Sequence, residues 1–474
     1  MARSSTPRRP SRRTPRKPAA PRLWGKDTLA IERMSQEGRG VARRNGKIVF
    51  VSGALEGEQV LAQCTAVKKG FDEAVMLERV AETAPCADRV QPECPVFNDC
   101  GGCSLQHWSL DAQIRHKQAT LRSMLQAISP LELAPPITSE PTGFRHRLRL
   151  LVTRTAEKRY LLALRQHRSR EAVTVQHCLV AAAPVNAMLK ALPEMLQKAP
   201  ELQGLREIEI DADGNSQLGL CFYFAANPGE KVLSALRDTV LTDPVVALRV
   251  RLNALKKPRE DTPFNAEGDD DTGQWQELLA EGELHLWPEG KNSESPLPAL
   301  ELGYLPGDFT QTQWAVNSAL VARAMDWLQP GSDEHALDLF AGVGNFSLPL
   351  ARRAKTVHTF ESDGSMTARV TANAGRNDIG NLRATTLDLM TDEVQLPRAD
   401  IAILDPPRAG AKAVCEALVR AKVKRLVYVS CHPATLLRDA HILHNAGYRL
   451  SCAATVDMFP HTGHSEAIAL FQRK

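Results

Sequence analysis

The cysteine at position 431 has the surroundings of a catalytic nucleophile. It stands in Ser-Cys-His-Pro at residues 430–433, directly after the apolar, strand-like run Val-Tyr-Val at 427–429. A thiol at the end of a strand can reach a ligand at the edge of a sheet, so Cys431 is a candidate nucleophile. Asp405 and Glu466 flank it in the sequence. The alternative is a buried cysteine with a structural role, the commoner state of a free thiol.

A second group of cysteines has the spacing of a metal site. Cys94, Cys100 and Cys103 form Cys-x5-Cys-Gly-Gly-Cys, and Cys178 follows in Gln-His-Cys at 176–178. Four thiolates suit either Zn²⁺ or an iron–sulfur cube, and spacing alone does not choose between these. Cys86, just upstream, is a rival for one of the four positions.

The bulk composition indicates a chain with several packed domains. Its 474 residues are 43% hydrophobic, which is enough for two or three domains with real cores. No stretch reaches the roughly 18 apolar residues of a membrane span, and the amino terminus lacks the apolar core of a signal peptide. We therefore expect a cytoplasmic protein, in which ten cysteines indicate metal ligation, catalysis or burial rather than disulfides.

Charge is distributed unevenly, although the formal net charge is only +4. Residues 1–23 carry eight Arg and Lys and no acid, which predicts a disordered basic tail. Residues 259–299 are rich in Asp, Glu, Gly and Pro and predict a solvated acidic insertion. Residues 145–170 hold nine basic residues against Glu157, at strand-like alternation. This stretch predicts a phosphate-contacting surface, with an ordinary solvated sheet face as the alternative.

Short β-rich runs between glycine-bearing turns predict a small barrel at about residues 24–82. The runs are 28–32, 47–51, 59–67 and 73–77, and such spacing is typical of a small β-barrel. The sequences at 35–42 and 49–58 resemble a TRAM domain, the OB-like barrel joined to several RNA-modifying enzymes. An SH3-like barrel without RNA contact is the alternative.

From residue 331 onward the hydrophobic pattern alternates between strands and helices. The predicted strands are 335–340, 357–361, 401–404, 427–430, 454–458 and 467–471, and the predicted helices are 346–353, 367–375 and 413–421. This order is typical of a doubly wound, Rossmann-like α/β domain. The predicted fold class is therefore multidomain, with an N-terminal β-barrel, a central α+β domain and a C-terminal Rossmann-like domain.

The first strand of that last domain runs into a glycine loop, Asp-Leu-Phe-Ala-Gly-Val-Gly-Asn at 338–345. A dinucleotide fingerprint needs a third glycine, which Ser347 replaces here. Glu361 ends the next strand, about twenty residues on, where a carboxylate can accept hydrogen bonds from both ribose hydroxyls. A ligand with a single ribose fits better than NAD, and the pattern resembles a class I S-adenosylmethionine-dependent methyltransferase. The alternative is a loop whose glycines merely turn the chain.

A methyl donor next to Cys431 suits one reaction well. Carbon 5 of uracil is weakly nucleophilic, but thiolate addition at carbon 6 creates an enolate that can take the methyl group, after which a base removes the carbon-5 proton. Asp-Pro-Pro-Arg at 405–408, Ser-Cys-His-Pro at 430–433 and residues 457–466 together resemble the RNA uracil-C5 methyltransferase family. By that resemblance Cys431 is the nucleophile and Glu466 is the base.

The same resemblance implies the positions that hold cofactor and substrate. They are Gln311, Phe340, Asn345, Glu361, Asp388 and Asp405. The family's usual Ser-Cys-Asn-Pro carries His432 here in place of the asparagine. An imidazole could supply the hydrogen bond that the amide would make.

Members of the family that act on ribosomal RNA bind a [4Fe–4S] cluster through a matching cysteine pattern. The resemblance therefore implies such a cluster at Cys94, Cys100, Cys103 and Cys178, in a structural role because the net reaction moves no electrons. It also implies a central iron–sulfur domain of residues 83–105 and 141–302. The methyltransferase domain then comprises residues 106–140 and 303–474.

The implied donor is S-adenosyl-L-methionine, the implied partner is 23S ribosomal RNA, and the chain is expected to be a monomer. Two alternatives stay open. One is methylation of another uracil, in transfer RNA or elsewhere in ribosomal RNA. The other is a non-catalytic RNA-binding protein that keeps the fold.

Overall fold

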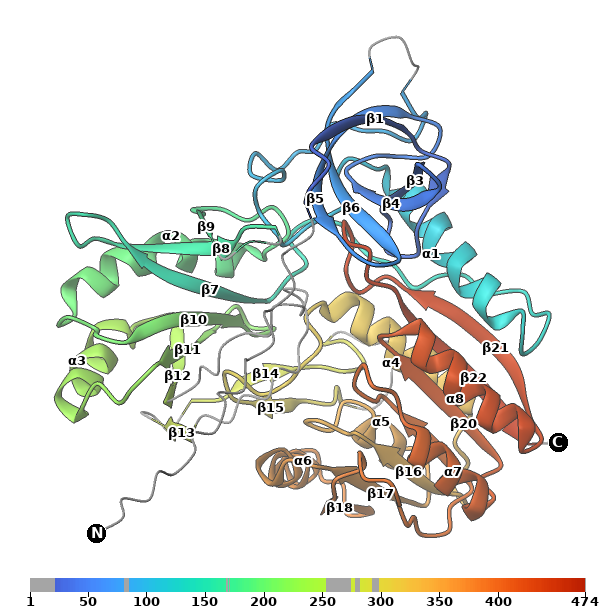
Figure 1. The fold of residues 1–474 in the computed structure, drawn as a ribbon. Coiled ribbons are helices and arrows are strands. Elements are labelled where there is room, and N and C mark those ends of the chain that lie inside the picture. The colour runs from blue at the N-terminus through green and yellow to red at the C-terminus, as the bar shows by residue number, and fades with distance from the viewer. Residues whose placement is uncertain are drawn as a thin grey trace, which may run out of the picture. The chain divides into compact units, whose positions relative to one another are not determined.

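The computed structural model describes residues 22–80, 85–167, 169, 171–252, 274–277, 282–291 and 298–473 (Figure 1). The chain divides into two compact units, of which unit 1 contains residues up to 35 and 39–87 and unit 2 contains 36–38 and 88–474. The predicted basic tail falls outside the described residues, apart from its last two positions. Across the described ranges, no helix has the length and apolar character that crossing a membrane requires.

Unit 1 is a six-stranded sheet in the order β1-β5-β6-β4-β3-β2. Its strands are β1 (Lys26–Ala30), β2 (Arg33–Met34), β3 (Gly40–Arg44), β4 (Lys47–Ser52), β5 (Gln59–Val67) and β6 (Phe71–Arg79). All pairings are antiparallel except that of β4 with β6. Alternate residues such as Val49, Val51, Val60 and Ala62 are fully buried, as the strand period of two requires. The predicted β-rich runs are therefore confirmed as strands.

The middle part of unit 2 is an α+β layer structure. Its sheet has the order β13-β12-β11-β10-β7-β8-β9. The strands are β7 (Arg147–Arg154), β8 (Tyr160–Arg165), β9 (Ala172–Thr174), β10 (Leu205–Ala212), β11 (Leu218–Phe224), β12 (Val245–Leu252) and β13 (Gln274–Glu277). Helices α2 (Ala183–Lys198) and α3 (Glu230–Val240) pack on this sheet, because α2 presents Val185, Leu189, Leu192 and Leu196 along one buried face.

The last part of unit 2 is a seven-stranded sheet in the order β18-β17-β16-β19-β20-β22-β21. Its strands are β16 (His335–Leu339), β17 (Thr356–Glu361), β18 (Leu382–Thr386), β19 (Ile401–Leu404), β20 (Arg425–Ser430), β21 (Tyr448–Val456) and β22 (Glu466–Arg473). The first five run parallel, whereas β22 runs antiparallel to both β20 and β21. The strand order reverses at the β16–β19 pair, where ligands bind in doubly wound sheets.

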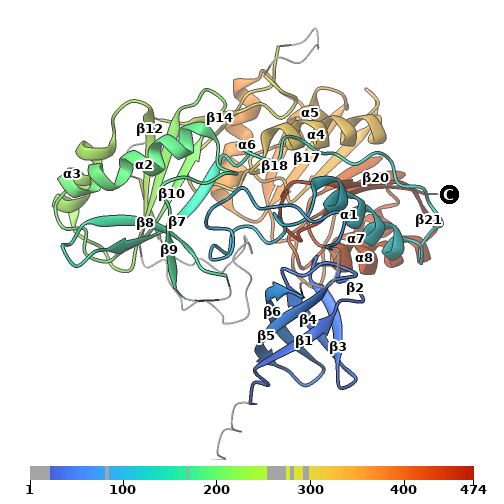
Figure 2. The same cartoon turned by 90° about the horizontal axis from the view of Figure 1, so that it is seen from above.

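Helices cover both faces of this sheet (Figure 2). One face packs against α1 (Leu110–Leu125), α7 (Lys412–Ala421) and α8 (Pro433–Asn445). The other face packs against α4 (Trp314–Leu328) and α5 (Ser347–Ala351), and α6 (Gly364–Arg376) contacts β17 and β18. The alternation along β20 explains the sandwich, since Leu426 and Tyr428 belong to the first core and Val427 and Val429 to the second.

Residues between the cysteine segment and β7 also belong to this layer. Helix α1 contacts α8 and β21, and the amides of Ala134 and Ile137 donate to carbonyls of Ala453 and Thr455 on β21, both at 2.9 Å. The segment from 110 to 137 is therefore built onto the outer strand of the last sheet.

The prediction of a solvated acidic insertion at 259–299 is wrong for residues 282–291. Leu284 and Leu286 lie on β14 (Leu284–Leu286), which pairs with β15 (Leu302–Tyr304), and both side chains are buried. The acidic composition masked a short Leu-His-Leu alternation that buries one face. Residues 253–273, 278–281 and 292–297 of this region lie outside the described residues.

Candidate active site

The predicted site residues gather where the parallel strands end. Phe340 follows β16, Glu361 ends β17, Asp388 follows β18, and Asp405 follows β19. Because these strands are parallel neighbours, their carboxyl ends meet at one edge of the sheet. Cys431 follows β20 at the same edge.

The glycine loop after β16 is built for close approach of a ligand. Phe340 has a φ of +67°, an uncommon conformation for a residue with a side chain, and Gly342 and Gly344 have φ of +55° and +100°. A Cβ on Gly344 would lie 2.8 Å from Leu348, whereas one on Gly342 would meet nothing within 4 Å. The loop is therefore packed on its inner side and open at Gly342.

Glu361 connects this loop to the next strand. Its carboxylate accepts hydrogen bonds from the amides of Gly342 at 3.0 Å, Ser362 at 2.7 Å and Asp363 at 3.1 Å. Asp363 in turn caps α6 by accepting from the amides of Ser365 and Met366. The position of the Glu361 carboxylate is thus set by backbone groups.

The other predicted cofactor residues have separate partners. Asn345 forms a reciprocal amide pair with Asn317 of α4, both bonds at 2.9 Å. Asp388 is exposed and accepts from the amide of Met390 at 2.8 Å. Gln311 donates to the carboxylate of Asp405 at 3.2 Å. No sequence pattern indicates that Asn317 pairs with Asn345, because α4 is not among the predicted helices.

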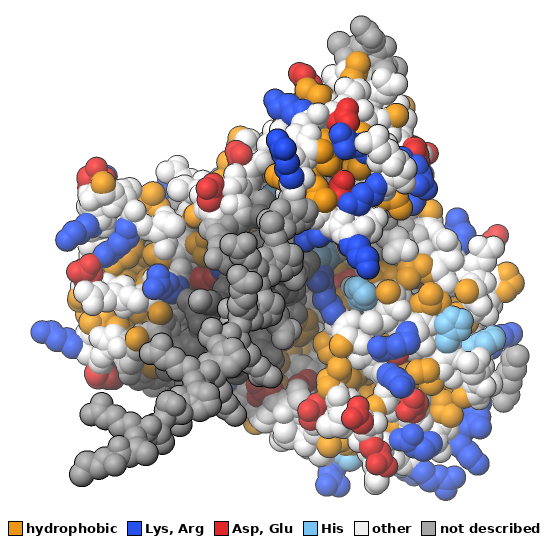
Figure 3. Space-filling view, in the orientation of Figure 1, with side chains coloured by type: hydrophobic (Ala, Val, Ile, Leu, Met, Phe, Trp, Pro, Cys, Tyr) orange, Lys and Arg blue, Asp and Glu red, His pale blue; other side chains and the backbone are white. Residues whose placement is uncertain are grey.

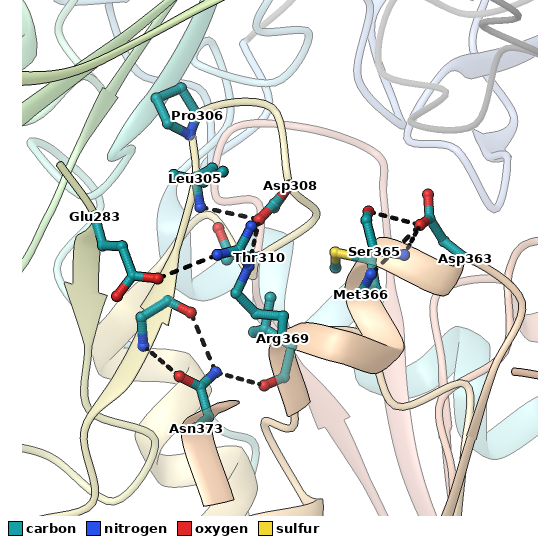
Figure 4. A network of polar contacts seen from close by, with 12 residues as sticks. Glu283, Leu305, Pro306, Asp308, Thr310, Asp363, Ser365, Met366, Arg369 and Asn373 are labelled. Atoms are coloured by element: carbon teal, nitrogen blue, oxygen red, sulfur yellow. Dashed lines mark hydrogen bonds and ion pairs between the residues drawn. The ribbon is translucent and has the colours of Figure 1, made fainter. Parts of the chain in front are cut away.

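A buried charge network fixes the segment that carries Gln311. Asp308 is 5% exposed and accepts from Arg249 at 2.8 Å, and the guanidinium of Arg369 on α6 lies 3.1 Å away. Figure 4 shows Arg369 between Asp308 and Glu283, with Thr310 beside them. Charges so deeply buried are stable only when paired, so this network holds residues 305–310 in one position.

The two strands beside the switch point bring the proposed nucleophile and base together. Strands β20 and β22 are antiparallel, and Ser430 pairs with Ala467. Cys431 directly follows Ser430, and Glu466 directly precedes Ala467. The Glu466 carboxylate is close enough to Cys431 to raise the pKa of its thiol. Glu466 is 6% exposed.

The electrostatics of Cys431 favour the protonated thiol. Burial, followed by the nearby carboxylates of Glu466 and Asp405, raises its pKa to about 12, and Arg408 acts in the opposite direction. Burial also raises the pKa of Asp405 to about 7. An ionised nucleophile at this position therefore requires an additional positive charge or a proton acceptor.

Two histidines complete the site. An Nη of Arg408 lies 2.9 Å from Nδ1 of His464, and burial and nearby cations lower the pKa of His464 to about 4, so its ring is neutral and accepts this bond. His432 precedes α8, and its carbonyl accepts from Thr435 at 2.9 Å. The Arg408–His464 bond joins groups that lie 56 positions apart, which is why no local pattern reveals it.

The four predicted cluster ligands line one cavity. This four-cysteine cavity is bordered by Cys94, Cys100, Cys103 and Cys178, together with Arg145, Gln106 and His177 among others. Burial raises the pKa of Cys103 to about 12 and raises those of Cys100 and Cys178, and Arg145 lowers all three. Within the described ranges, no group of three or more His, Cys, Asp or Glu side chains is arranged to hold a metal ion.

The rival ligand Cys86 belongs to unit 1. There its backbone amide donates to the carboxylate of Glu58 at 3.5 Å.

The basic strands of the central sheet are partly neutralised. Arg149 and Arg165 both pair with Glu207, at 2.6 and 2.8 Å, and Arg147 pairs with Asp211. These acids lie on β10, which is paired with β7. Arg154 also pairs with Glu201 at 2.6 Å, so four basic side chains of the predicted phosphate-contacting surface at 145–170 have acidic partners. On the face shown in Figure 3, Lys and Arg side chains are interspersed with Asp and Glu.

Comparisons with known proteins show similarity along most of the chain. A family model described as tRNA (Uracil-5-)-methyltransferase matches residues 303–474, and a TRAM domain model matches residues 28–77. The chain is similar to two proteins named 23S rRNA (uracil(1939)-C(5))-methyltransferase RlmD. The one from Pseudomonas putida is 35% identical over 97% of this chain and 96% of the relative. The one from Shewanella amazonensis is 36% identical over 96% of this chain and 97% of the relative.

One solved structure has a similar fold along most of the chain. It is the Pyrococcus abyssi tRNA (uracil-54, C5)-methyltransferase in complex with S-adenosyl-L-homocysteine, which is 20% identical. The TM-score is 0.67, and the match covers 94% of this chain and 100% of the other. At that identity the likeness concerns the fold.

Proposed function

The chain belongs to the RlmD family of 23S rRNA uracil-C5 methyltransferases, and we propose that it methylates carbon 5 of one uridine in 23S ribosomal RNA. The methyl donor is S-adenosyl-L-methionine, and the target corresponds to the uridine numbered 1939 in the names of its relatives. The observation that carries the proposal is the position of Cys431 near the carboxylates of Glu466 and Asp405, at the sheet edge where the glycine loop also begins.

The reaction proceeds in three balanced steps. The Cys431 thiolate adds to carbon 6 of the uracil, which moves the electron pair of the ring double bond into an enolate. Carbon 5 then attacks the methyl group of the sulfonium, and S-adenosyl-L-homocysteine leaves with the electron pair of the broken bond. Glu466 removes the carbon-5 proton, and the electrons of that bond expel the Cys431 thiolate.

Deprotonation of Cys431 is coupled to binding of the donor. The raised pKa keeps the thiol protonated in the free protein. The donor brings a positively charged sulfonium to the same sheet edge, and a nearby cation favours the thiolate. Asp405, with its pKa of about 7, and Gln311 are suited to hydrogen-bond the polar edge of the uracil.

The donor itself is held by the first half of the sheet. Glu361 accepts hydrogen bonds from the ribose hydroxyls, and the open side of Gly342 admits the amino acid part of the donor. Phe340, Asn345 and Asp388 are the further residues proposed to line this pocket.

The four-cysteine cavity is proposed to hold a [4Fe–4S] cluster. A cube of four irons takes one thiolate at each iron corner and is larger than a single ion. Four thiols that line one cavity supply the donors that a cube needs, and the resemblance to the family's cysteine pattern favours the cube over Zn²⁺. The cluster would cross-link the segments 94–103 and 176–178, and it takes no part in methyl transfer.

The partner and setting follow from the family. The TRAM domain of unit 1 binds RNA in this proposal, and the protein is proposed to act in the cytoplasm as a monomer. In unit 1, Arg39 lies over the ring of Phe50 at 4.6 Å, which offers a flat cationic and aromatic surface for a base.

Mapping 5-methyluridine in ribosomal RNA tests this function. RNA from a deletion strain should lack the modification at one 23S position, and the purified protein with S-adenosyl-L-methionine should restore it. Restoration at a transfer RNA position instead would redirect the substrate assignment. Donor binding without transfer to any RNA would favour the non-catalytic alternative.

A further inference from the structure

The loop that leads to Glu466 is held from outside the last sheet. Residues 457–465 connect β21 to β22 and are called the β21–β22 loop here. The base of the proposed reaction is the first residue after it. Whatever fixes this loop therefore fixes where the Glu466 carboxylate lies.

The loop contains a residue in an unfavourable backbone conformation. His461 has a φ of +64°, a strained conformation for a residue with a side chain, which persists only where the surrounding contacts impose it. Both of its peptide groups are bound. Its amide donates to the side-chain oxygen of Gln113 at 2.9 Å, and its carbonyl accepts from the amides of Ser104 at 2.9 Å and Leu105 at 2.8 Å.

Gln113 of helix α1 makes the first set of contacts that fix the β21–β22 loop. Gln113 is 1% exposed, and its amide nitrogen donates to the carbonyls of Leu105 at 3.0 Å and Trp108 at 2.7 Å. One amide therefore uses both its ends to join the 105–108 turn to the loop. All three of these hydrogen bonds go to backbone groups, so the Gln113 side chain positions the main chain.

A buried ion pair makes the second set. Lys117, one turn further along α1, donates to the carboxylate of Asp457 at 2.7 Å and to the carbonyl of Phe459 at 3.1 Å. The two charged side chains are 2% and 4% exposed. Such a pair contributes little net stability compared with apolar residues of the same size, but it fixes geometry when the partners lie on different elements.

We propose that Gln113 and Lys117 on α1 are positioning residues for the catalytic base, because they hold the β21–β22 loop so that the Glu466 carboxylate lies near Cys431. Neither touches the substrate or the donor in this assignment. The inference rests on the proposed function, since it gives a role to the loop only if Glu466 removes the carbon-5 proton.

Proton removal can be separated from the earlier steps. RNA with 5-fluorouridine at the target allows thiolate addition and methyl transfer, but the fluorine at carbon 5 is not lost as a proton is, so the covalent adduct persists. Trapping on this RNA needs Cys431 and the donor and does not need Glu466. Turnover on ordinary RNA needs all three.

The principal variant is Lys117→Met combined with Asp457→Leu, which replaces the buried pair with apolar side chains and leaves no unpaired charge. We expect turnover on ordinary RNA to fall by about 10- to 100-fold, the effect of displacing a reacting group by about 1 Å. Trapping on 5-fluorouridine RNA should change by less than about 3-fold, and the methylated covalent adduct should accumulate on ordinary RNA.

Arg115→Met is the matched control. Arg115 lies on the same helix, but its side chain is 60% exposed and pairs with Asp88 at the surface. This change should leave both turnover and trapping as in the unmodified protein. Gln113→Met is the second variant if the double substitution does not fold, because an unbranched side chain of similar length fills the same space.

Equal losses of turnover and trapping in the folded variants would overturn the proposal. They would show that the contacts of α1 with the loop position the whole active site and not the catalytic base alone. Unchanged turnover would overturn it as well. The proposed function is tested apart from it by Cys431→Ala in the same assay. If that variant trapped 5-fluorouridine RNA, the mechanism would be wrong whatever the α1 variants did.

Discussion

Two cysteine sites in this chain both have raised thiol pKa values but differ in their surroundings. At the end of β20, one sulfur lies near the carboxylates of Glu466 and Asp405, with Arg408 as the opposing charge. At the four-cysteine cavity, the four cysteines and Arg145 line the same space. Burial raises the pKa of Cys431 at the first site and of Cys100, Cys103 and Cys178 at the second, so an ionised thiol at either site requires an additional positive charge or a proton acceptor. In the proposed function, the sulfonium of the methyl donor supplies positive charge at Cys431, and an iron–sulfur cluster supplies it at the four-cysteine cavity. In this proposal the source of positive charge therefore decides the role of each cysteine.

Replacing Cys431 should have the largest effect on methyl transfer. Cys431→Ser should lower methyl transfer by about 10⁴-fold or more, because a hydroxyl does not replace a thiolate nucleophile. Single-turnover transfer from labelled S-adenosyl-L-methionine measures this. Cys452→Ser, at a half-buried position on β21, is the control and should transfer normally. Activity above about 1% in Cys431→Ser would remove the distinction between the two cysteine groups.

Neutralising the neighbouring base should have the next largest effect. Glu466→Gln keeps the shape of the side chain but not its ability to take a proton, so turnover should fall by about 10²- to 10⁴-fold. Because the earlier steps remain, a covalent complex with ordinary RNA should accumulate and be visible by denaturing electrophoresis. A variant that loses turnover and forms no complex would place Glu466 in an earlier step.

Replacing one cysteine of the four-cysteine cavity should lower both the iron content and the melting temperature of the protein. Cys103→Ser should lower iron and labile sulfide from about four each per chain to well below that, in protein purified without oxygen. The melting temperature should fall by about 5 °C or more, because metal binding contributes to folding free energy. Cys221→Ser is unsuitable as a control, since that side chain is fully buried in the central sheet. Cys452→Ser serves again, and an iron content independent of Cys103 would contradict the cluster.

The smallest expected effect tests the carboxyl beside Cys431. The pKa of Asp405 is about 7 in the folded protein and has an ordinary value of 3.8. Between these values the folded state retains a proton that the unfolded state has lost, so this group costs stability increasingly as pH rises from about 4 to 7, and fully above 7.

Asp405→Asn should therefore raise the melting temperature at pH 8 by at least about 2 °C, raise it less at pH 5, and reduce methyl transfer. Asp400→Asn is the control and should lower the melting temperature instead. The His335 amide and Lys424 lower the pKa of Asp400, so its ionised form stabilises the folded protein. Thermal unfolding at the two pH values measures both. An equal rise in melting temperature at both pH values would show that burial does not raise the pKa of Asp405.

The sequence predicted those parts of the site that lie within one local pattern. The glycine loop, Glu361 at a strand end and Cys431 after an apolar strand each occupy the expected place, because strand period and turn chemistry are local. Strand β18 was missed because its residues are half-exposed and show little alternation. Helices α4 and α8 were missed too, as was the reversed direction of β22.

Charge partners were the least predictable feature. Lys117 and Asp457 are 340 positions apart, and the basic strand β7 gives no sign that β10 carries its acids. A run of like charges describes composition on one strand, whereas neutralisation depends on which strand lies beside it. Only the paired sheet supplies that information.

The ladder register between β20 and β22 has a consequence for the RNA. Since the β20–β22 ladder ends at the Ser430–Ala467 pair, directly next to Cys431 and Glu466, we expect the protein to have little freedom to follow a uracil that is still stacked. The deformation free energy must then fall on the nucleic acid, whose base has to leave its stack to fit between them. We expect selection among uridines to follow local RNA structure as well as sequence, with bases already unstacked in loops requiring the least distortion.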